Sequence, residues 1–130
     1  MKILVGYDGT TTAKDALTLA KEHAKAFNAE VYVMNSLEGG EKTSMEDIEK
    51  AKSDLPYAEG FFKDNNVPCE THLLIRGMEP GEDIVMFAKE HEIDEIVVGV
   101  RKRSKVGKFL LGSTAQYVIL EAHCRVVTIK

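Results

Sequence analysis

Five short apolar runs alternate along the chain with longer segments in which apolar residues recur every three or four positions. The runs lie at 3–7, 31–34, 69–75, 93–98 and 125–129. The segments between them have the periodicity of amphipathic helices. Parallel strands need a long crossover, usually a helix, and strands that are buried on both faces are almost continuously apolar. This alternation therefore predicts a doubly wound α/β fold, in which a five-stranded parallel sheet carries helices on both faces.

The helix boundaries are marked by capping and turn residues. The first helix should end at Asn28, and the second is expected over about residues 45–65, after Thr43 or Ser44. Pro56 lies inside the second helix and should kink or interrupt it, because proline lacks the backbone N–H that an interior turn needs. The apolar stripes expected to face the sheet include Met45 and Phe62 in the second helix and Phe27 in the first.

Length and composition indicate one soluble domain spanning residues 1–130. The net charge of −4 argues against general nucleic-acid binding. The two cysteines lie in apolar runs, which is typical of buried, reduced thiols in a cytosolic protein. Met1 leads directly into a strand rather than a secretory leader, and the apolar runs are far shorter than the ~20 residues of a membrane span. We therefore expect a cytoplasmic protein that does not associate with membranes.

A basic loop joins the end of the fourth apolar run to the start of the last helix. It carries Arg101, Lys102, Arg103, Lys105 and Lys108, five of the 17 basic residues, so twelve remain elsewhere against 21 acidic ones. Gly99 precedes the loop, and the helix opens at 112–114, Gly-Ser-Thr, where unpaired backbone N–H groups and hydroxyls suit a phosphate oxygen. The pattern favours an anion site; the alternative is that Ser113 only caps the helix and the lysines are simply solvated.

The chain shows no pattern for turnover chemistry. Gly107-Lys108 lacks the rest of a Walker A loop, Ser113 has no base placed by sequence, and the four histidines have no metal-site spacing. A receiver domain would require a second carboxylate beside Asp8, which the sequence does not have. A flavodoxin would need aromatic residues at the later strand ends, and none is well placed there. Asp8 could equally be a turn or cap residue before 9–12. We expect neither catalytic nor metal-binding residues.

Three segments together resemble the universal stress protein family: ILVGYDGT at 3–10, VVGVRK at 97–102 and KFLLGSTAQYVI at 108–119. The resemblance extends over essentially the whole chain. Nucleotide-binding members of that family share glycine, two residues, glycine, nine residues and then Gly-Ser or Gly-Thr. Gly99 matches the first position and 112–113 the last, whereas Lys102 replaces the second glycine.

The resemblance implies a fold like that of the adenine nucleotide α-hydrolases and universal stress proteins, with ATP or AMP as the ligand, with or without Mg²⁺. It places Asp8 near the base and ribose and lets Asn35 and Ser36 flank the adenine through backbone groups. The residues implied at the phosphates are Gly99, Arg101, Lys102, Gly112, Ser113 and Thr114. A Cβ at Lys102 would hold the loop away from the phosphates, or its ammonium would reach a phosphate directly.

The function expected from the resemblance is regulatory nucleotide binding without efficient turnover. Slow hydrolysis of a bound nucleotide is compatible with this function, because it needs no dedicated base. The β-branched strand at Val126–Ile129 resembles the strand through which the family commonly forms a twofold dimer, and its edge has nothing after it to cover it. The alternative is a nucleotide-free dimeric interaction module of the same fold, whose basic loop binds an acidic partner.

Overall fold

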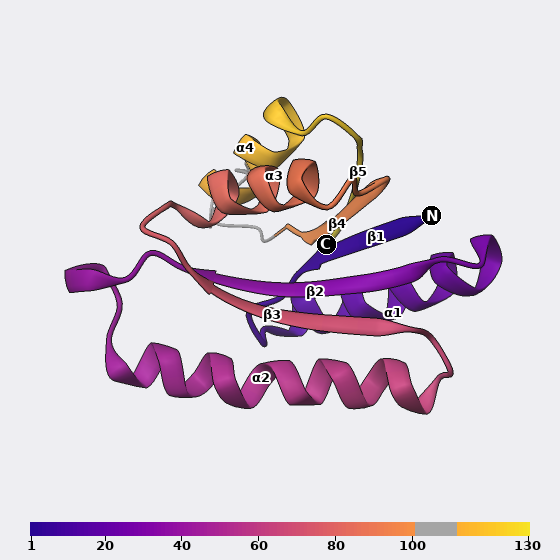
Figure 1. The fold of residues 1–130 in the computed structure, drawn as a ribbon, viewed down its shortest axis with the longest axis horizontal. Helices are drawn as coiled ribbons and strands as arrows, with labels where there is room; N and C mark the ends of the chain where they lie inside the picture. Colours follow the sequence, from indigo (N-terminus) through magenta and orange to yellow (C-terminus); the bar gives the residue numbers. More distant parts are fainter. Residues whose placement is uncertain (101–111) are drawn as a thin grey trace, which may run out of the picture.

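In the computed structural model, which describes residues 1–100 and 112–130, every apolar run forms a strand and every periodic segment a helix (Figure 1). The predicted alternation of strands and helices is therefore confirmed. The elements are β1 (Lys2–Gly6), α1 (Thr11–Phe27), β2 (Glu30–Leu37), a short 3₁₀ turn (Gly40–Lys42), α2 (Met45–Asp64), β3 (Cys69–Ile75), α3 (Pro80–Glu90), β4 (Glu95–Gly99), α4 (Ser113–Glu121) and β5 (Arg125–Ile129).

The five strands form one parallel sheet in the order β3-β2-β1-β4-β5. The chain builds outward from β1 to β3, then returns to the other side of β1 and continues to β5. The strand order thus reverses between β1 and β4, and doubly wound sheets bind ligands at the carboxyl ends of the strands beside such a reversal. The predicted fold class is confirmed, and the reversal locates the edge at which to look for a site.

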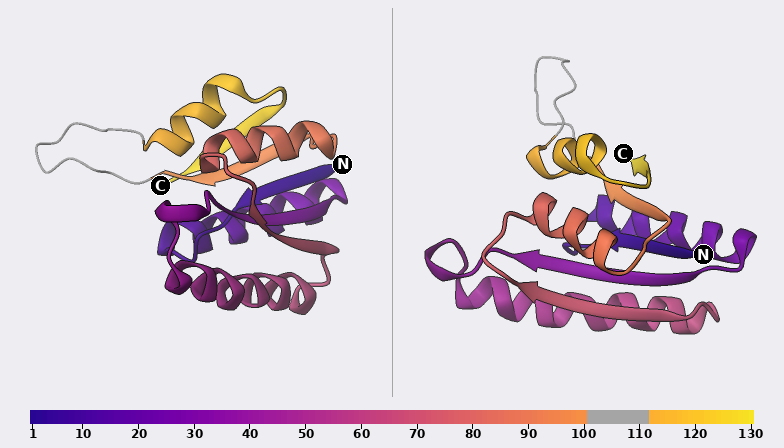
Figure 2. Two further views of the ribbon diagram at one scale, coloured as in Figure 1. Left: turned by 60° about the vertical axis from the view of Figure 1, so that its left-hand side comes forward. Right: turned by 45° about the horizontal axis from the view of Figure 1, so that its top comes forward.

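Helices cover both faces of the sheet. In β1, Ile3 and Val5 face one core with α1 and α2, whereas Leu4 faces a second core with α3 and α4. Both views in Figure 2 show α2 and α4 on opposite sides of the sheet. This two-sided burial explains why the strands are almost continuously apolar.

Three details of the helices and strands differ from the expectations. β2 continues to Leu37, so Asn35 and Ser36 lie inside the strand rather than after it. The predicted break at Pro56 is wrong, because α2 is continuous; the proline is exposed, and water can bond the carbonyl that loses its partner. Phe27 and Met45 are 54% and 70% exposed, since each lies at a helix end.

Candidate functional site

A cavity of about 190 Å³ opens at the carboxyl ends of β1, β2 and β4. Its lining brings together five of the residues singled out from the sequence, although they are far apart along the chain: Asp8, Asn35, Ser36, Gly99 and Thr114. The cavity lies where the strand order reverses, as the architecture requires.

The other singled-out residues are not in this lining. Gly112 and Ser113 directly precede Thr114 at the start of α4, but neither lines the cavity. Arg101 and Lys102, with the rest of the basic loop, lie outside the described residues. The alternative in which Ser113 serves as the helix cap does not hold, because Gly112 occupies the N-cap position and Ser113 is the first helical residue.

Three helices begin at the cavity. The start of α1 contributes Thr10 and Thr12, α3 contributes Pro80, and α4 contributes Thr114 and Ala115. The N-terminus of a helix carries a partial positive charge and unpaired N–H groups, so three of them at one cavity favour an anionic ligand.

The starts of α1 and α4 differ in how they are capped. In α1 the hydroxyl of Thr10 accepts a hydrogen bond from the Ala13 N–H at 3.2 Å. Gly112 has no side chain to cap α4, and no side-chain capping hydrogen bond is formed there within the described residues. The amides in the first turn of α4 are therefore the better donors for a ligand.

The loop after β1 is held from two sides. The Asp8 carboxylate accepts hydrogen bonds from the Thr10 N–H at 3.1 Å and from the Thr10 hydroxyl at 2.7 Å. From α2, the Lys50 ammonium donates to the Asp8 carbonyl at 2.8 Å and to the Asp54 carboxylate at 2.7 Å. Asp8 is thus both a turn residue, which was one of the two roles considered from the sequence, and part of the cavity wall.

Gly9 has to be glycine in this loop. Its φ of +79° is strained for any other residue, and an added Cβ would lie 2.6 Å from the Asp54 carboxylate. The contact of α2 with the cavity loop was not predicted from the sequence, since Lys50 lies 42 residues from Asp8 along the chain.

Tyr7 stays uncharged at neutral pH. Burial, together with the neighbouring groups Asp54, Tyr57 and Asp8, raises its pKa to about 12. Its side chain is buried and it lines the cavity. Tyr7 therefore adds no negative charge to the cavity wall.

At β2, hydrogen bonding to β1 stops before the strand does. The register of the two strands ends at Gly6 beside Met34, and the last recorded bond runs from the Tyr7 N–H to the Met34 carbonyl at 2.9 Å. Backbone groups along a strand face the same side at every second residue. The backbone N–H and C=O of Ser36, two residues beyond Met34, therefore face the side of β2 where β1 has already ended. Ser36 lines the cavity there.

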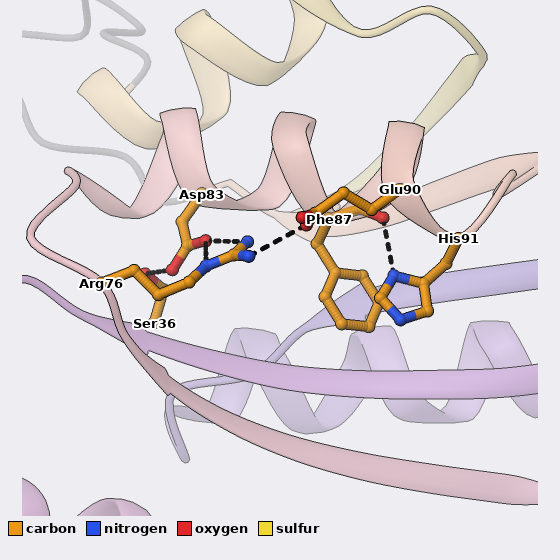
Figure 3. Close-up of polar contacts among 6 residues, drawn as sticks. All are labelled: Ser36, Arg76, Asp83, Phe87, Glu90 and His91. Carbon is orange, nitrogen blue, oxygen red and sulfur yellow. Dashed lines mark hydrogen bonds and ion pairs between the residues drawn. The ribbon is translucent and has the colours of Figure 1, made fainter.

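Behind Ser36 lies a network of charged side chains that the sequence analysis did not find (Figure 3). Asp83, in the first turn of α3, is fully buried and accepts a hydrogen bond from the Ser36 hydroxyl at 2.6 Å. Arg76, just after β3, donates to the other carboxylate oxygen through Nε at 2.8 Å and also through Nη2. Its Nη1 donates to Glu90 at 2.9 Å.

The charged form of Arg76 is favoured in this network. Burial acts against the charge, but the hydrogen bonds and negative charges of Asp83 and Glu90 outweigh that effect and raise the pKa of the guanidinium. Arg76 therefore stays positively charged at neutral pH. A buried carboxylate that has both oxygens bonded fixes the geometry of its neighbours.

Gly99 meets α1 closely. A Cβ at this position would lie 2.7 Å from the Thr12 methyl group and 3.2 Å from the Thr12 carbonyl carbon. The family pattern already gives one reason for glycine at position 99. The structure adds a second reason, since the start of α1 packs directly onto β4 here.

Neither a metal cluster nor a membrane span is present in the part of the chain that the structure describes. Within residues 1–100 and 112–130, no three His, Cys, Asp or Glu side chains are grouped so that they could hold a metal ion. No helix in those ranges is both long and apolar enough to cross a bilayer.

The fold and the cavity define a class of protein: a doubly wound α/β domain with a small ligand cavity at the point where the strand order reverses. The model of the universal stress protein family matches residues 1–130. The chain belongs to the universal stress protein family, which confirms the resemblance in its three segments.

Relatives support the same assignment over the full chain. A universal stress protein of Thermus aquaticus is 34% identical, over 98% of this chain and 97% of the relative. A solved universal stress protein of Archaeoglobus fulgidus is 40% identical with a TM-score of 0.89, covering 100% of this chain and 93% of that one. A second A. fulgidus structure, a complex with dAMP, is 38% identical with a TM-score of 0.83, covering 99% and 96%.

Proposed function

We propose that this protein binds an adenine nucleotide, ATP or AMP, in the cavity and uses it as a regulatory ligand without efficient turnover. The observation that carries the proposal is the convergence of Asp8, Ser36, Gly99 and Thr114 on one cavity into which three helix N-termini open. The 38% identical A. fulgidus relative, whose structure holds dAMP, supports an adenine nucleotide rather than another anion.

The cavity offers a different chemistry to each part of the ligand. The backbone of Asn35 and Ser36 would flank the adenine, and Asp8 would lie near the base and ribose. The phosphates would lie toward the starts of α1 and α4, near Gly99, Gly112, Ser113 and Thr114, with Arg101 and Lys102 supplying cations. Mg²⁺ would enter only with the triphosphate, since it binds phosphate oxygens readily.

The cavity wall also supports binding without turnover. Its described residues include threonine and serine hydroxyls but no histidine, cysteine or lysine that could activate one. The Ser36 hydroxyl is already committed to Asp83. Asp8 supplies a carboxylate to the described lining, but that carboxylate is bonded to Thr10, so hydrolysis of a bound triphosphate would lack a dedicated base and would be slow.

Isothermal titration with AMP and with ATP, each with and without Mg²⁺, tests the proposal. We expect the protein to bind at least one of these with a dissociation constant below the millimolar range. Failure of both to bind would favour the second candidate, a nucleotide-free interaction module. In that case Lys102→Gly, which restores the second glycine of the family pattern, should recover binding.

The Gly112→Leu variant tests the phosphate end of the site. Gly112 has φ −64° and ψ 155°, which any residue adopts, so the fold should persist while a bulky side chain stands before the open amides of α4. We expect AMP affinity to fall roughly 10- to 150-fold, the equivalent of about 1.5–3 kcal/mol for a charged hydrogen bond. Circular dichroism checks the fold, and unchanged affinity would contradict the assignment.

We also propose a homodimer formed through β5. This strand is an edge of the sheet, and its apolar residues Val126, Val127 and Ile129 are only partly buried. The Ile129 carbonyl bonds the Val100 N–H on the β4 side at 2.7 Å. By the two-residue period, the backbone groups of Thr128 point to the open edge, where a second copy could pair with them.

The Thr128→Pro variant should convert the dimer to a monomer. Proline removes the outward N–H that the second copy would bond, yet edge strands tolerate it where that N–H faces away from the sheet. Thr128→Val keeps the N–H and should remain dimeric. Light scattering after size-exclusion chromatography reports the mass, and a dimeric Thr128→Pro variant would exclude pairing through this edge.

A cytoplasmic location fits the chemistry of the two cysteines. Cys69 and Cys124 are not joined in a disulfide. Burial, with the charges of Glu59 and Glu70, raises the pKa of the Cys69 thiol to about 12. A thiol with this pKa is protonated and unreactive, as expected of a structural cysteine in a reducing compartment.

A further inference from the structure

Ser36 serves two surfaces at once. Ser36 lines the cavity, and the strand register directs its backbone N–H and C=O to the side where β1 has ended, while its side chain points to the face where α3 lies. The residue is buried, and its hydroxyl hydrogen is committed to the Asp83 carboxylate at 2.6 Å. Any force that fixes the Ser36 side chain therefore also fixes a piece of the cavity wall.

That force comes from a closed ionic network. One Asp83 oxygen accepts from Ser36, and the other accepts from Nε and Nη2 of Arg76, so neither oxygen of this fully buried carboxylate is left without a donor. Arg76 is itself held by Glu90, which lies two turns further along α3. The end of β2, the segment after β3 and the start of α3 are thus joined at Asp83 (Figure 3).

We propose that Asp83 and Arg76 are positioning residues that hold the Ser36 backbone rigid enough to select the base of the nucleotide. This inference rests on the proposed nucleotide site. The N–H and C=O of Ser36 form a donor beside an acceptor. Adenine presents the complementary pair, the N1 acceptor and the 6-amino donor, whereas hypoxanthine presents an N1–H donor and a 6-carbonyl acceptor. Against a fixed Ser36 backbone, hypoxanthine would therefore place its N1–H against the N–H and its 6-carbonyl against the C=O, and neither pair can form a hydrogen bond.

The Ser36 backbone discriminates between the two bases only if it is held rigid. A strand end that is free to shift could rotate its N–H away or admit a water molecule, and would then accept either base. A site whose polar groups are fixed rejects a mismatched ligand much more strongly, because the buried groups are left unpaired. The network should therefore affect the preference for adenine over hypoxanthine, and not only the stability of the fold.

AMP and inosine monophosphate differ only in the group at position 6 of the base and in the proton on N1, so titrating both into each variant measures the selectivity directly. Asp83→Asn keeps the shape of the side chain but removes the negative charge that binds Arg76, and the Ser36 hydroxyl has to turn round to accept from the new amide group. Ser36→Ala removes the hydroxyl and keeps the backbone. Glu90→Gln is the matched control, because it weakens the same network at its far end and leaves the Ser36–Asp83 bond in place.

We expect wild type to prefer AMP over inosine monophosphate by at least about tenfold. Asp83→Asn and Ser36→Ala should lose most of that preference through weaker AMP binding, while Glu90→Gln keeps it. Thermal unfolding shows which variants are folded. If Asp83→Asn does not fold, the Ser36→Ala variant alone tests the positioning role. Unchanged selectivity, or an equal loss for both ligands, would overturn the positioning role. If wild type binds neither nucleotide, the proposed function itself fails.

Discussion

The Gly99→Val variant is expected to lose AMP binding by at least about 100-fold. A Cβ alone at this position would lie 2.7 Å from the Thr12 methyl group and 3.2 Å from the Thr12 backbone, and valine adds two more methyl groups. Rotation of the Thr12 side chain would not relieve the contact, because the Thr12 Cβ and carbonyl carbon would also lie 3.2 Å away. The start of α1 must move off β4, and the cavity wall that Thr12 and Gly99 share moves with it.

The same change made on α2 serves as the control. Gly60→Val places the same side chain where a Cβ would have no atom within 4 Å. We expect Gly60→Val to bind AMP like wild type, while Gly99→Val also loses about 1–3 kcal/mol of unfolding free energy through overpacking. Titration calorimetry and urea unfolding measure the two effects. Wild-type affinity in Gly99→Val would place the nucleotide elsewhere.

Local patterns were sufficient to predict the elements of this fold. β3 and β5 begin and end at the predicted residues, because Cys69–Ile75 and Arg125–Ile129 are apolar runs bounded by turn residues. The wrong predictions also arise because these patterns are local. Phe27 and Met45 follow the helical period but lie at helix ends, beyond the sheet that would cover them. Periodicity shows which side of a helix is apolar, not how far its partner extends.

The cavity was predictable in part because parallel strands end at a common edge. Asp8 and Gly99 follow from that rule, whereas the order of the strands does not, since it depends on pairings between distant segments. Asp83 was not predicted as part of the site, because its partners Ser36 and Arg76 lie 47 and 7 residues away. No local pattern distinguishes a buried acid from an exposed one at that position.

One missed cluster did leave a signal in the sequence. Glu95 is the first residue of an otherwise apolar β4, and a lone charge in a buried strand requires a partner. It is 2% exposed, and its carboxylate contacts His23 Nδ1 at 2.6 Å and Arg125 Nε at 3.1 Å. The charge was visible in the sequence; its partners, on α1 and β5, became evident only from the fold.

The Phe62→Ala variant should show the reverse of Gly99→Val: a large loss of stability with the site intact. Phe62 is fully buried between α2 and the sheet, and its ring meets that of Phe61 edge to face at 5.2 Å. Removing a buried phenylalanine costs about 3–5 kcal/mol, from lost burial and from the cavity left behind. For a domain of this size, we expect the melting temperature to fall by roughly 10–15 °C.

Phe27→Ala is the matched control, since it deletes the same ring at a position that is 54% exposed. It should change the unfolding free energy by less than about 1 kcal/mol. Because the cavity lining does not include Phe62, the fraction of Phe62→Ala that is folded at low temperature should bind AMP with wild-type affinity. Equal melting temperatures for the two variants would contradict the packing of α2, and weaker AMP binding by folded Phe62→Ala would show that α2 sets the Asp8 loop through Lys50.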